Sequence, residues 1–361
     1  MFIKTRIFIY ILRYIRQLFK KRNSLLFLII FGILSLAFLL DITLGSVQIP
    51  ITEVIKILLG GESEKPSWTN IIFKFRLPKA ITAMLAGAAL GISGLQMQTL
   101  FRNPLAGPFV LGISSGASLG VALLVLTVNL AGMGTIFPTL GIFGDLSLVI
   151  ASSLGAAAVL GLVLLVSRRV RDTMTLLILG LLFGYATSAL VSILLHFSDT
   201  QKIQVYLQWT FGSFAGVTWQ QMPILATVVI LALIIAVVLS KPLNVLLVGE
   251  SYALTLGLNL PKTRFWVITS ASILAGVITA FCGPIAFLGV AVPHLCRSLF
   301  NTYDHRILAP ATMIMGAILA LIADLICVLP GYETVLPLNS VTALIGTPVV
   351  AWVILRRYYV V

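Results

Sequence analysis

The stretch from Gln221 to Leu239 reads QMPILATVVILALIIAVVL and contains no charged residue. A helix rises about 1.5 Å per residue, so this stretch would extend roughly 28 Å, close to the roughly 30 Å thickness of the hydrocarbon layer. A backbone in lipid must satisfy its hydrogen bonds internally, which favours a helix over an isolated strand. The stretch therefore predicts a membrane-spanning helix.

Similar apolar runs recur along the whole chain. The 361 residues are 59% hydrophobic and 10% charged, whereas roughly a quarter of the residues in soluble domains are charged. The runs lack the sustained alternation of membrane barrels. We therefore expect an all-α polytopic membrane protein with about ten transmembrane helices. The expected spans are residues 25–44, 78–100, 109–130, 147–166, 175–196, 221–239, 265–282, 285–300, 307–328 and 338–356. Gly283-Pro284 separates two short runs, which could also form one broken span.

The basic residues are distributed unevenly between the two sides of this predicted topology. If the N-terminus is cytoplasmic, 18 of the 24 Lys and Arg residues fall in cytoplasmic loops and tails. Cytoplasmic loops carry such an excess in membrane proteins. The distribution predicts that both termini are cytoplasmic. It also accounts for the net charge of +13 without nucleic-acid binding.

Two regions are expected along the chain. In residues 1–24, apolar residues recur at helical spacing between Ile3 and Phe19, with Arg and Lys on the other face. This pattern predicts a cytoplasmic amphipathic helix on an anionic lipid surface. No long linker divides residues 25–361, so they are expected to form a single transmembrane domain.

Small residues and a weak repeat indicate how the spans pack. Close backbone approach at small residues supplies much of the packing between helices in lipid. Residues 85–94, LAGAALGISG, and 274–283, LAGVITAFCG, share Leu-Ala-Gly and a final Gly, and internal repeats are common in transporters. Glycines at spacing four are Gly87 and Gly91, then Gly112, Gly116 and Gly120, then Gly180 and Gly184.

The spans contain few charged residues, and Asp324 is the clear exception. A carboxylate within a span is a candidate functional group. Its position close to Pro330 and Gly331 favours a capped structural group, and a proton relay is the alternative. The sequence contains no Walker A loop and no HExxH motif, so we expect no catalytic residue and no bound metal or cofactor in this chain.

Residues 244–260 form a short polar interruption between two apolar runs. Glu250 is expected to begin a helix, Ala253 and Leu254 to lie on its apolar face, and Gly257 to end it. The charge distribution places this helix in the cytoplasm. A soluble partner could bind it there, or it could lie on the lipid surface.

Six motifs occur in one order along the chain. They are RLPKAITAMLAGAALGISGLQMQTLFRNPLAGPFVLGISSGASLG at 76–120, GESYALTLGLNL at 249–260, GPIAFLGVAVPHLCR at 283–297, DHRILAP at 304–310, ADL at 323–325 and LPLNSVTALIGTP at 336–348. In these motifs the chain resembles the FecCD family, the permease subunits of the type II ATP-binding-cassette importers for ferric siderophores, haem and vitamin B12. The likeness covers residues 76–356.

The resemblance implies a vitamin B12 permease-like fold with two inverted halves in the bacterial inner membrane. It also implies a second copy of the chain, two cytoplasmic ATPase subunits that use ATP-Mg, and an external substrate-binding protein. The permease itself would be non-catalytic. Residues 244–260 would be the coupling helices that contact the ATPase.

The resemblance also suggests roles for individual residues. The coupling positions are Gly249, Glu250, Ser251, Ala253, Leu254 and Gly257, and the docking positions for the binding protein are Arg76 and Lys79. The pathway or gate positions are Thr173, Met174, Gln96, Met97, Gln98, Tyr185 and Ser188. Val328, Val335 and Asn339 depart from the family's usual residues near the outer gate.

The function expected from these observations is permeation of a ferric chelate, either a siderophore complex or haem. A corrinoid is the alternative cargo within the same family. Proton-driven secondary transport through Asp324 is the alternative from another class, and an integral-membrane enzyme is disfavoured because His, Asp and Glu are not clustered.

Overall fold

The computed structural model describes residues 2–127, 142–167, 169–170, 172–328 and 335–358. These residues form helices and connecting loops, and no strand occurs among them. A single antiparallel bridge joins Val328 to Val335. The expectation of an all-α protein is therefore confirmed.

Ten apolar helical segments fall on the ten predicted spans. Six are long enough to cross a membrane alone, a seventh is a pair bent by 46°, and three are shorter. The long helices are α1 (Phe2–Thr43), α4 (Leu77–Leu100), α6 (Ile142–Ser167), α7 (Thr173–His196), α12 (Leu260–Cys282) and α14 (His305–Cys327). The bent pair is α9 (Met222–Val238) with α10 (Ser240–Leu247), and the shorter helices are α5 (Ile113–Thr127), α13 (Leu288–Phe300) and α15 (Leu338–Tyr358).

The structure differs from the predicted boundaries at the N-terminus. The expected break near residue 25 is absent, because α1 continues from Phe2 to Thr43 as one helix. Neither Gly nor Pro lies between Arg22 and Leu25 to interrupt it. A helix of 42 residues is about 63 Å long, roughly twice the thickness of the hydrocarbon layer.

The two short runs around Gly283 form two separate helices, α12 and the shorter α13. Gly283 ends α12 with a φ of +74°, which glycine adopts at little cost. Phe287, with a φ of +64°, precedes α13. The chain therefore reverses between the two helices instead of continuing as one.

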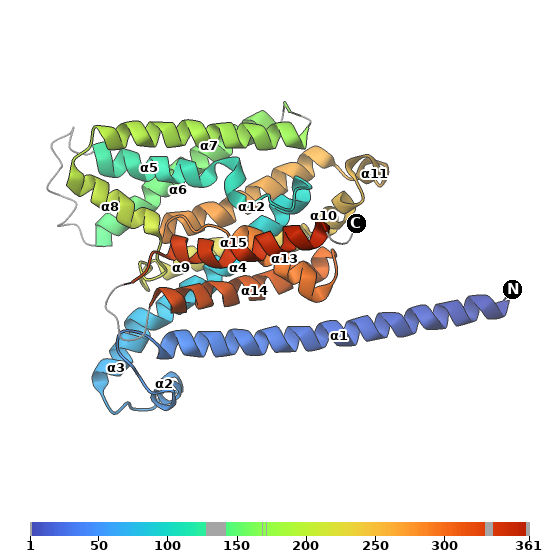
Figure 1. Ribbon diagram of the computed structural model, residues 1–361, viewed down its shortest axis with the longest axis horizontal. Coiled ribbons are helices and arrows are strands. Elements are labelled where there is room, and N and C mark those ends of the chain that lie inside the picture. Colours follow the sequence, from blue (N-terminus) through green and yellow to red (C-terminus); the bar gives the residue numbers. More distant parts are fainter. Residues whose placement is uncertain (1, 128–141, 168, 171, 329–334, 359–361) are drawn as a thin grey trace.

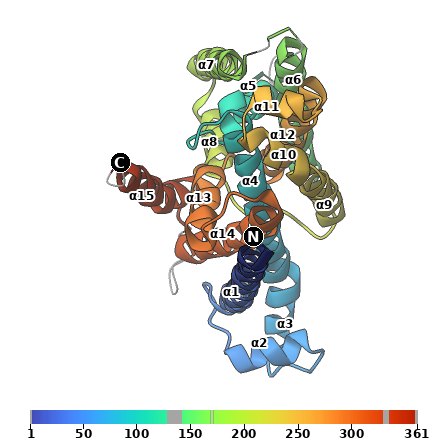
Figure 2. The same ribbon diagram turned by 90° about the vertical axis from the view of Figure 1, so that its right-hand side faces the viewer.

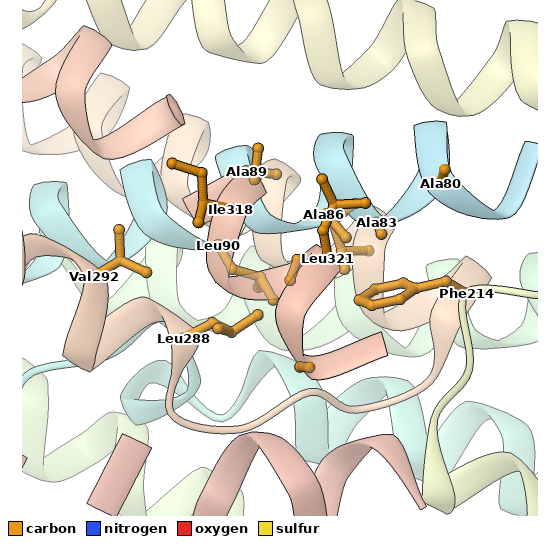
Figure 3. Packing of buried hydrophobic residues seen from close by; sticks show 14 of the residues in the cluster. Ala80, Ala83, Ala86, Ala89, Leu90, Phe214, Leu288, Val292, Ile318 and Leu321 are labelled. Atoms are coloured by element: carbon orange, nitrogen blue, oxygen red, sulfur yellow. The ribbon is translucent and has the colours of Figure 1, made fainter. Parts of the chain in front are cut away.

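Helix α4 lies at the centre of the molecule. It packs against α14, α13, α12 and α9, while α5, α6 and α7 form a layer on the other side of α12 (Figures 1 and 2). Ala80, Ala83 and Ala86 of α4 lie beside Leu321 of α14 and Phe214, as Figure 3 shows. The two segments of the weak repeat lie on α4 and α12, which pack side by side.

Figure 1 shows that different helices lie at the two ends of the bundle. The α2 end carries α2 (Ile51–Leu58), α3 (Pro66–Ile71) and α8 (Thr200–Phe211). The opposite end, called the α11 end, carries both chain termini, α10 and α11 (Glu250–Thr255). Both repeat helices connect these ends, and they run in opposite directions: α4 ends beside α10, whereas α12 starts after α11.

The predicted close packing at glycines is confirmed. A Cβ atom built on Gly87 would lie 2.0 Å from the carbonyl oxygen of Gly316, and one built on Gly94 would lie 1.6 Å from that of Gly289. Real Cβ atoms do not tolerate such distances. On the other side, Gly116 and Gly120 of α5 approach the backbone of α6 in the same way.

The contact between α4 and α13 gives a stability prediction. Gly94→Ala should lower the free energy of unfolding by about 1–3 kcal/mol or more, because the added methyl group overlaps a backbone that cannot move alone. Thermal unfolding of the purified protein in detergent would measure this loss. Gly32→Ala is the matched control, since a Cβ there meets nothing within 4 Å. Equal stability of the two variants would contradict the close approach.

Candidate functional site

Two short helices and a tight turn form an exposed segment at the α11 end. Gly249, with a φ of +123°, makes the turn between α10 and α11, and Gly257, with a φ of +80°, follows the end of α11. The side chain of Asn259 then accepts a hydrogen bond from the Lys262 amide and caps α12. The short helix predicted to begin at Glu250 and to stop at Gly257 is confirmed.

The apolar side chains of this segment point mostly outward. Ala253 is buried, but Leu254 and Leu256 are 57% and 68% exposed, and Tyr252 and Val248 are exposed to a similar extent. Ser251 is also exposed. Contiguous exposed apolar groups mark surfaces that a protein or a membrane covers. We call residues 247–256 the coupling surface.

Glu250 has a partner within the chain that sequence analysis did not identify. Its Oε1 atom accepts a hydrogen bond from Arg264 Nη2 at 2.7 Å. This ion pair joins α11 to the first turns of α12. The two residues are 14 positions apart and are separated by Gly257 and Pro261, so helical spacing gave no signal for the pair.

The start of α7 lies within the electrostatic influence of the same arginine. Asp172 caps α7 by accepting hydrogen bonds from the amide and the hydroxyl of Thr175, at 2.8 and 2.7 Å. The side-chain and backbone bonds from Thr175 lower the pKa of Asp172, and the positive charge of Arg264 adds a smaller effect in the same direction. Arg264 therefore interacts with both α11 and the start of α7.

The predicted pathway residues fall into two groups. Met174, Tyr185 and Ser188 lie on an exposed face of α7, which is mostly unburied along its length. The side chain of Thr173 lies outside the described residues. The exposed face of α7 could line a passage once a second molecule covers it.

The three predicted pathway residues on α4 lie inside the helix packing. Met97 belongs to a buried apolar cluster, and Gln96 donates a hydrogen bond to Ser270 Oγ of α12 at 3.2 Å. Gln98 is also buried and donates to the carbonyl oxygen of Val290 at 3.2 Å. In this structure they hold α4 against α12 and α13, and their expected place on the pathway stays a prediction. The apolar sequence of α4 has no polar stripe that could have shown which face is covered.

Arg76 and Lys79 lie near the α2 end, and both are engaged within the chain. The Arg76 guanidinium donates to the carbonyl oxygens of Ile42 and Thr43, each at 2.7 Å, and to that of Val47. Because Arg76 is buried, it ties the end of α1 to the start of α4. It does not present a free charge at the surface, and its docking role stays a prediction.

Lys79 bridges two buried carboxylates. Its ammonium lies 2.5 Å from Asp324 Oδ2 and 3.8 Å from Asp41 Oδ1. The three side chains come from α4, α14 and α1, and all are at least 87% buried. Asp324 is therefore part of a buried ion cluster, and its two sequence interpretations, a capped structural group and a proton relay, stay predictions. Asp41 was not among the candidate residues named from the sequence.

The departures from the family's outer motifs have local roles. Val328 and Val335 pair through the single bridge of the fold. Asn339 Oδ1 accepts a hydrogen bond from the Ala286 amide at 3.0 Å. That bond joins the start of α15 to the turn between α12 and α13.

The histidines of two motifs, His294 and His305, make local hydrogen bonds. His294 Nε2 contacts the carbonyl oxygen of Pro104 at 2.7 Å, and the His305 ring contacts Asn244 and Thr99 at 2.9 and 2.8 Å. Within the described ranges, no three His, Cys, Asp or Glu residues come close enough to hold a metal ion. The site is therefore made of helix faces and buried ion pairs.

The described residues form a multi-pass helical bundle with an exposed helix pair at one end and a mostly uncovered face on α7. The sequence matches the FecCD transport family over residues 33–356. The chain belongs to the FecCD transport family, whose members are permease subunits of ATP-binding-cassette transporters.

Relatives and a solved structure agree with this membership. An uncharacterized ABC transporter permease protein of Bacillus subtilis is 33% identical over 341 residues, covering 92% of this chain and 94% of the relative. The vitamin B12 import system permease protein BtuC of Klebsiella pneumoniae is 37% identical, covering 79% and 82%. A solved structure described as a metal-chelate type ABC transporter in an inward-facing conformation superposes with a TM-score of 0.78. It is 29% identical and covers 91% of this chain and 99% of that chain.

The buried ion cluster gives a second stability prediction. Lys79→Ala should lower the free energy of unfolding by about 3–5 kcal/mol, because it leaves Asp41 and Asp324 buried without their cation. Chemical or thermal unfolding in detergent would report the loss. Lys56→Ala removes an exposed pair with Glu53 and should change the stability by less than about 1 kcal/mol. Addition of Asp324→Asn to Lys79→Ala should restore part of the loss, and no restoration would contradict the pairing.

Proposed function

We propose that this chain is the membrane-spanning subunit of an ATP-driven importer for a bulky metal chelate. Two copies would pack around one pathway, with α7 of each copy facing it. The observation that carries the proposal is the coupling surface. It is a short helix pair with outward apolar side chains, in a chain that belongs to an ABC permease family.

The coupling surface would bind a cytoplasmic ATPase subunit. Movement of the ATPase would displace α11, and the ion pair between Glu250 and Arg264 would carry that displacement to α12. Arg264 also has a small electrostatic effect on Asp172, the cap of α7. A ligand shifts a conformational equilibrium only through unequal binding to the two states, and ATP-bound and ATP-free ATPase dimers would supply that difference.

The cargo is proposed at the level of a metal chelate. Ferric siderophores and haem are the cargo expected from the resemblance to the FecCD family, while the similarity to vitamin B12 permeases of 37% identity supports a corrinoid. The exposed α7 face, with Met174, Tyr185 and Ser188, is weakly polar. Such a face suits passage of a large ligand without tight binding. An external binding protein would supply the selectivity.

Reconstituted uptake tests this function. The chain would be purified with its co-purifying subunits from native membrane, placed in liposomes, and supplied with ATP and the external binding protein. Radiolabelled ferric siderophore, haem and cobalamin would be compared. We expect uptake of one chelate class that stops when ATP is withheld. Uptake by the chain alone, driven by a pH gradient without ATP, would instead establish secondary transport.

The coupling surface gives a sharper prediction. Leu254→Asp and Leu256→Asp should each weaken association with the ATPase by about tenfold or more, because each places a carboxylate in an apolar contact. Both side chains are exposed in the isolated chain, so folding should be unaffected. Leu59→Asp is the matched control, since Leu59 is 83% exposed at the opposite end. Equal affinity of all variants, measured by co-purification and titration, would contradict the assignment.

The ion pair between α11 and α12 predicts uncoupling. Glu250→Arg places a second cation against Arg264, so transport should fall while ATP hydrolysis persists. The double variant Glu250→Arg with Arg264→Glu restores opposite charges and should recover part of the transport. Uptake and hydrolysis would be measured on the same liposomes. Normal uptake by the single variant would show that this pair does not transmit the motion.

A further inference from the structure

A cavity of about 280 Å³ opens at the α11 end, beside the coupling surface. Its buried lining includes Gln98 and Thr99 at the end of α4. The lining also contains Arg102, Leu247, Arg297 and Tyr303. None of the lining residues, all of which the structure describes, is acidic.

Both arginines are held in place from different elements. Arg102 follows α4 with a φ of +48°, and its Nη2 atom donates to the carbonyl oxygen of Leu246 at 3.3 Å. Arg297 lies on α13, donates to Gln98 Oε1, and stacks 5.8 Å from the ring centre of Tyr303. Two positioned guanidinium groups therefore border one cavity, and each has several N–H donors.

The acidic residues closest in sequence to the lining are not part of it. Glu250 pairs with Arg264 at 2.7 Å, and Asp304 accepts a hydrogen bond from Asn244 at 2.6 Å. The lining itself carries two cationic side chains and no acidic one. Arginine forks bind carboxylates and phosphates with paired hydrogen bonds, so the complementary ligand is an anion.

The position of the cavity indicates where that anion comes from. Leu247 belongs both to the cavity lining and to the exposed coupling surface. The bond from Arg102 to Leu246 fastens the cavity to α10. A protein that covers the coupling surface would therefore also cover the mouth of the cavity.

We propose that this cavity receives an Asp or Glu side chain of the ATPase subunit. The proposal rests on the proposed function and identifies a charged contact beside the apolar one. The apolar coupling surface would provide contact area, and the two arginines would fix the register of the two proteins through a carboxylate. Charge pairs at interfaces act in this way on specificity and association rate.

Equilibrium binding is the first test. The permease, in nanodiscs of zwitterionic phosphatidylcholine, would be titrated with its ATPase subunit, identified from the native complex. Arg102→Gln and Arg297→Gln should each raise the dissociation constant about tenfold and reduce its dependence on salt. Arg306→Gln is the matched control, because Arg306 is exposed at the same end and does not line the cavity; it should change the constant by less than about twofold.

Zero-length cross-linking is the second test. A carbodiimide joins amines, and not guanidinium groups, to carboxylates. Arg102→Lys should therefore give a cross-link between residue 102 and an acidic peptide of the ATPase, while wild type gives none at that position. Arg102 is exposed and its described contact is with a backbone oxygen, so this variant remains informative even if Arg297→Gln does not fold.

The outcomes of these tests distinguish a failure of the proposed function from a failure of the proposed anion contact. If wild-type permease fails to bind the ATPase, the proposed function fails and this inference fails with it. If wild type binds and the cavity variants bind equally, only the inference is overturned. It is also overturned if native mass spectrometry finds phosphatidylglycerol or inorganic phosphate retained by wild type and lost from Arg102→Gln, since the anion would then be a lipid headgroup or a free ion.

Discussion

The fold depends on the close approach of helix backbones at glycine. In lipid, water does not drive apolar surfaces together, so van der Waals contact between helices must supply much of the stability. Gly87 against Gly316 and Gly94 against Gly289 bring α4 into direct backbone contact with α14 and α13. A second set, on α5 and α6, does the same in the other layer. Because α4 contacts so many neighbours, its small face determines where the other helices lie.

Charged residues complement this packing at the two ends of the bundle. Near the α2 end, Lys79 binds two buried carboxylates and Arg76 binds backbone carbonyl oxygens, so helices α1, α4 and α14 are joined. At the α11 end, Glu250 and Arg264 join α11 to α12. The first cluster is buried. The ion pair between Glu250 and Arg264 is partly exposed and lies beside the coupling surface. A contact at this position can move when a partner protein binds.

Much of the fold could be predicted from the sequence because apolar length and glycine positions are strong local signals. The apolar helices follow from long runs with few charged residues, and the end of α11 follows from Gly257. The continuity of α1 was missed because a change in amphipathic pattern at residue 25 does not by itself break a helix. The burial of Gln96 and Gln98 was missed because pairing with Ser270 and Val290 depends on tertiary packing. For the same reason, nothing local to Lys79 indicated Asp324 as its partner.

Helix α12 begins at the cap made by Asn259 and ends at Gly283, where a Cβ atom would lie 2.4 Å from the carbonyl oxygen of Trp209 in α8. Its only proline, Pro261, lies in the first turn, so no proline kinks the rest of the helix. The helix can therefore act as a strut about 34 Å long. A tilt of α12 by a few degrees about Arg264 would displace its C-terminal end, which lies next to α8, by about an ångström or more. A displacement at the α11 end could thus reach the opposite end of the bundle through a tilt of α12, without repacking of the other helices.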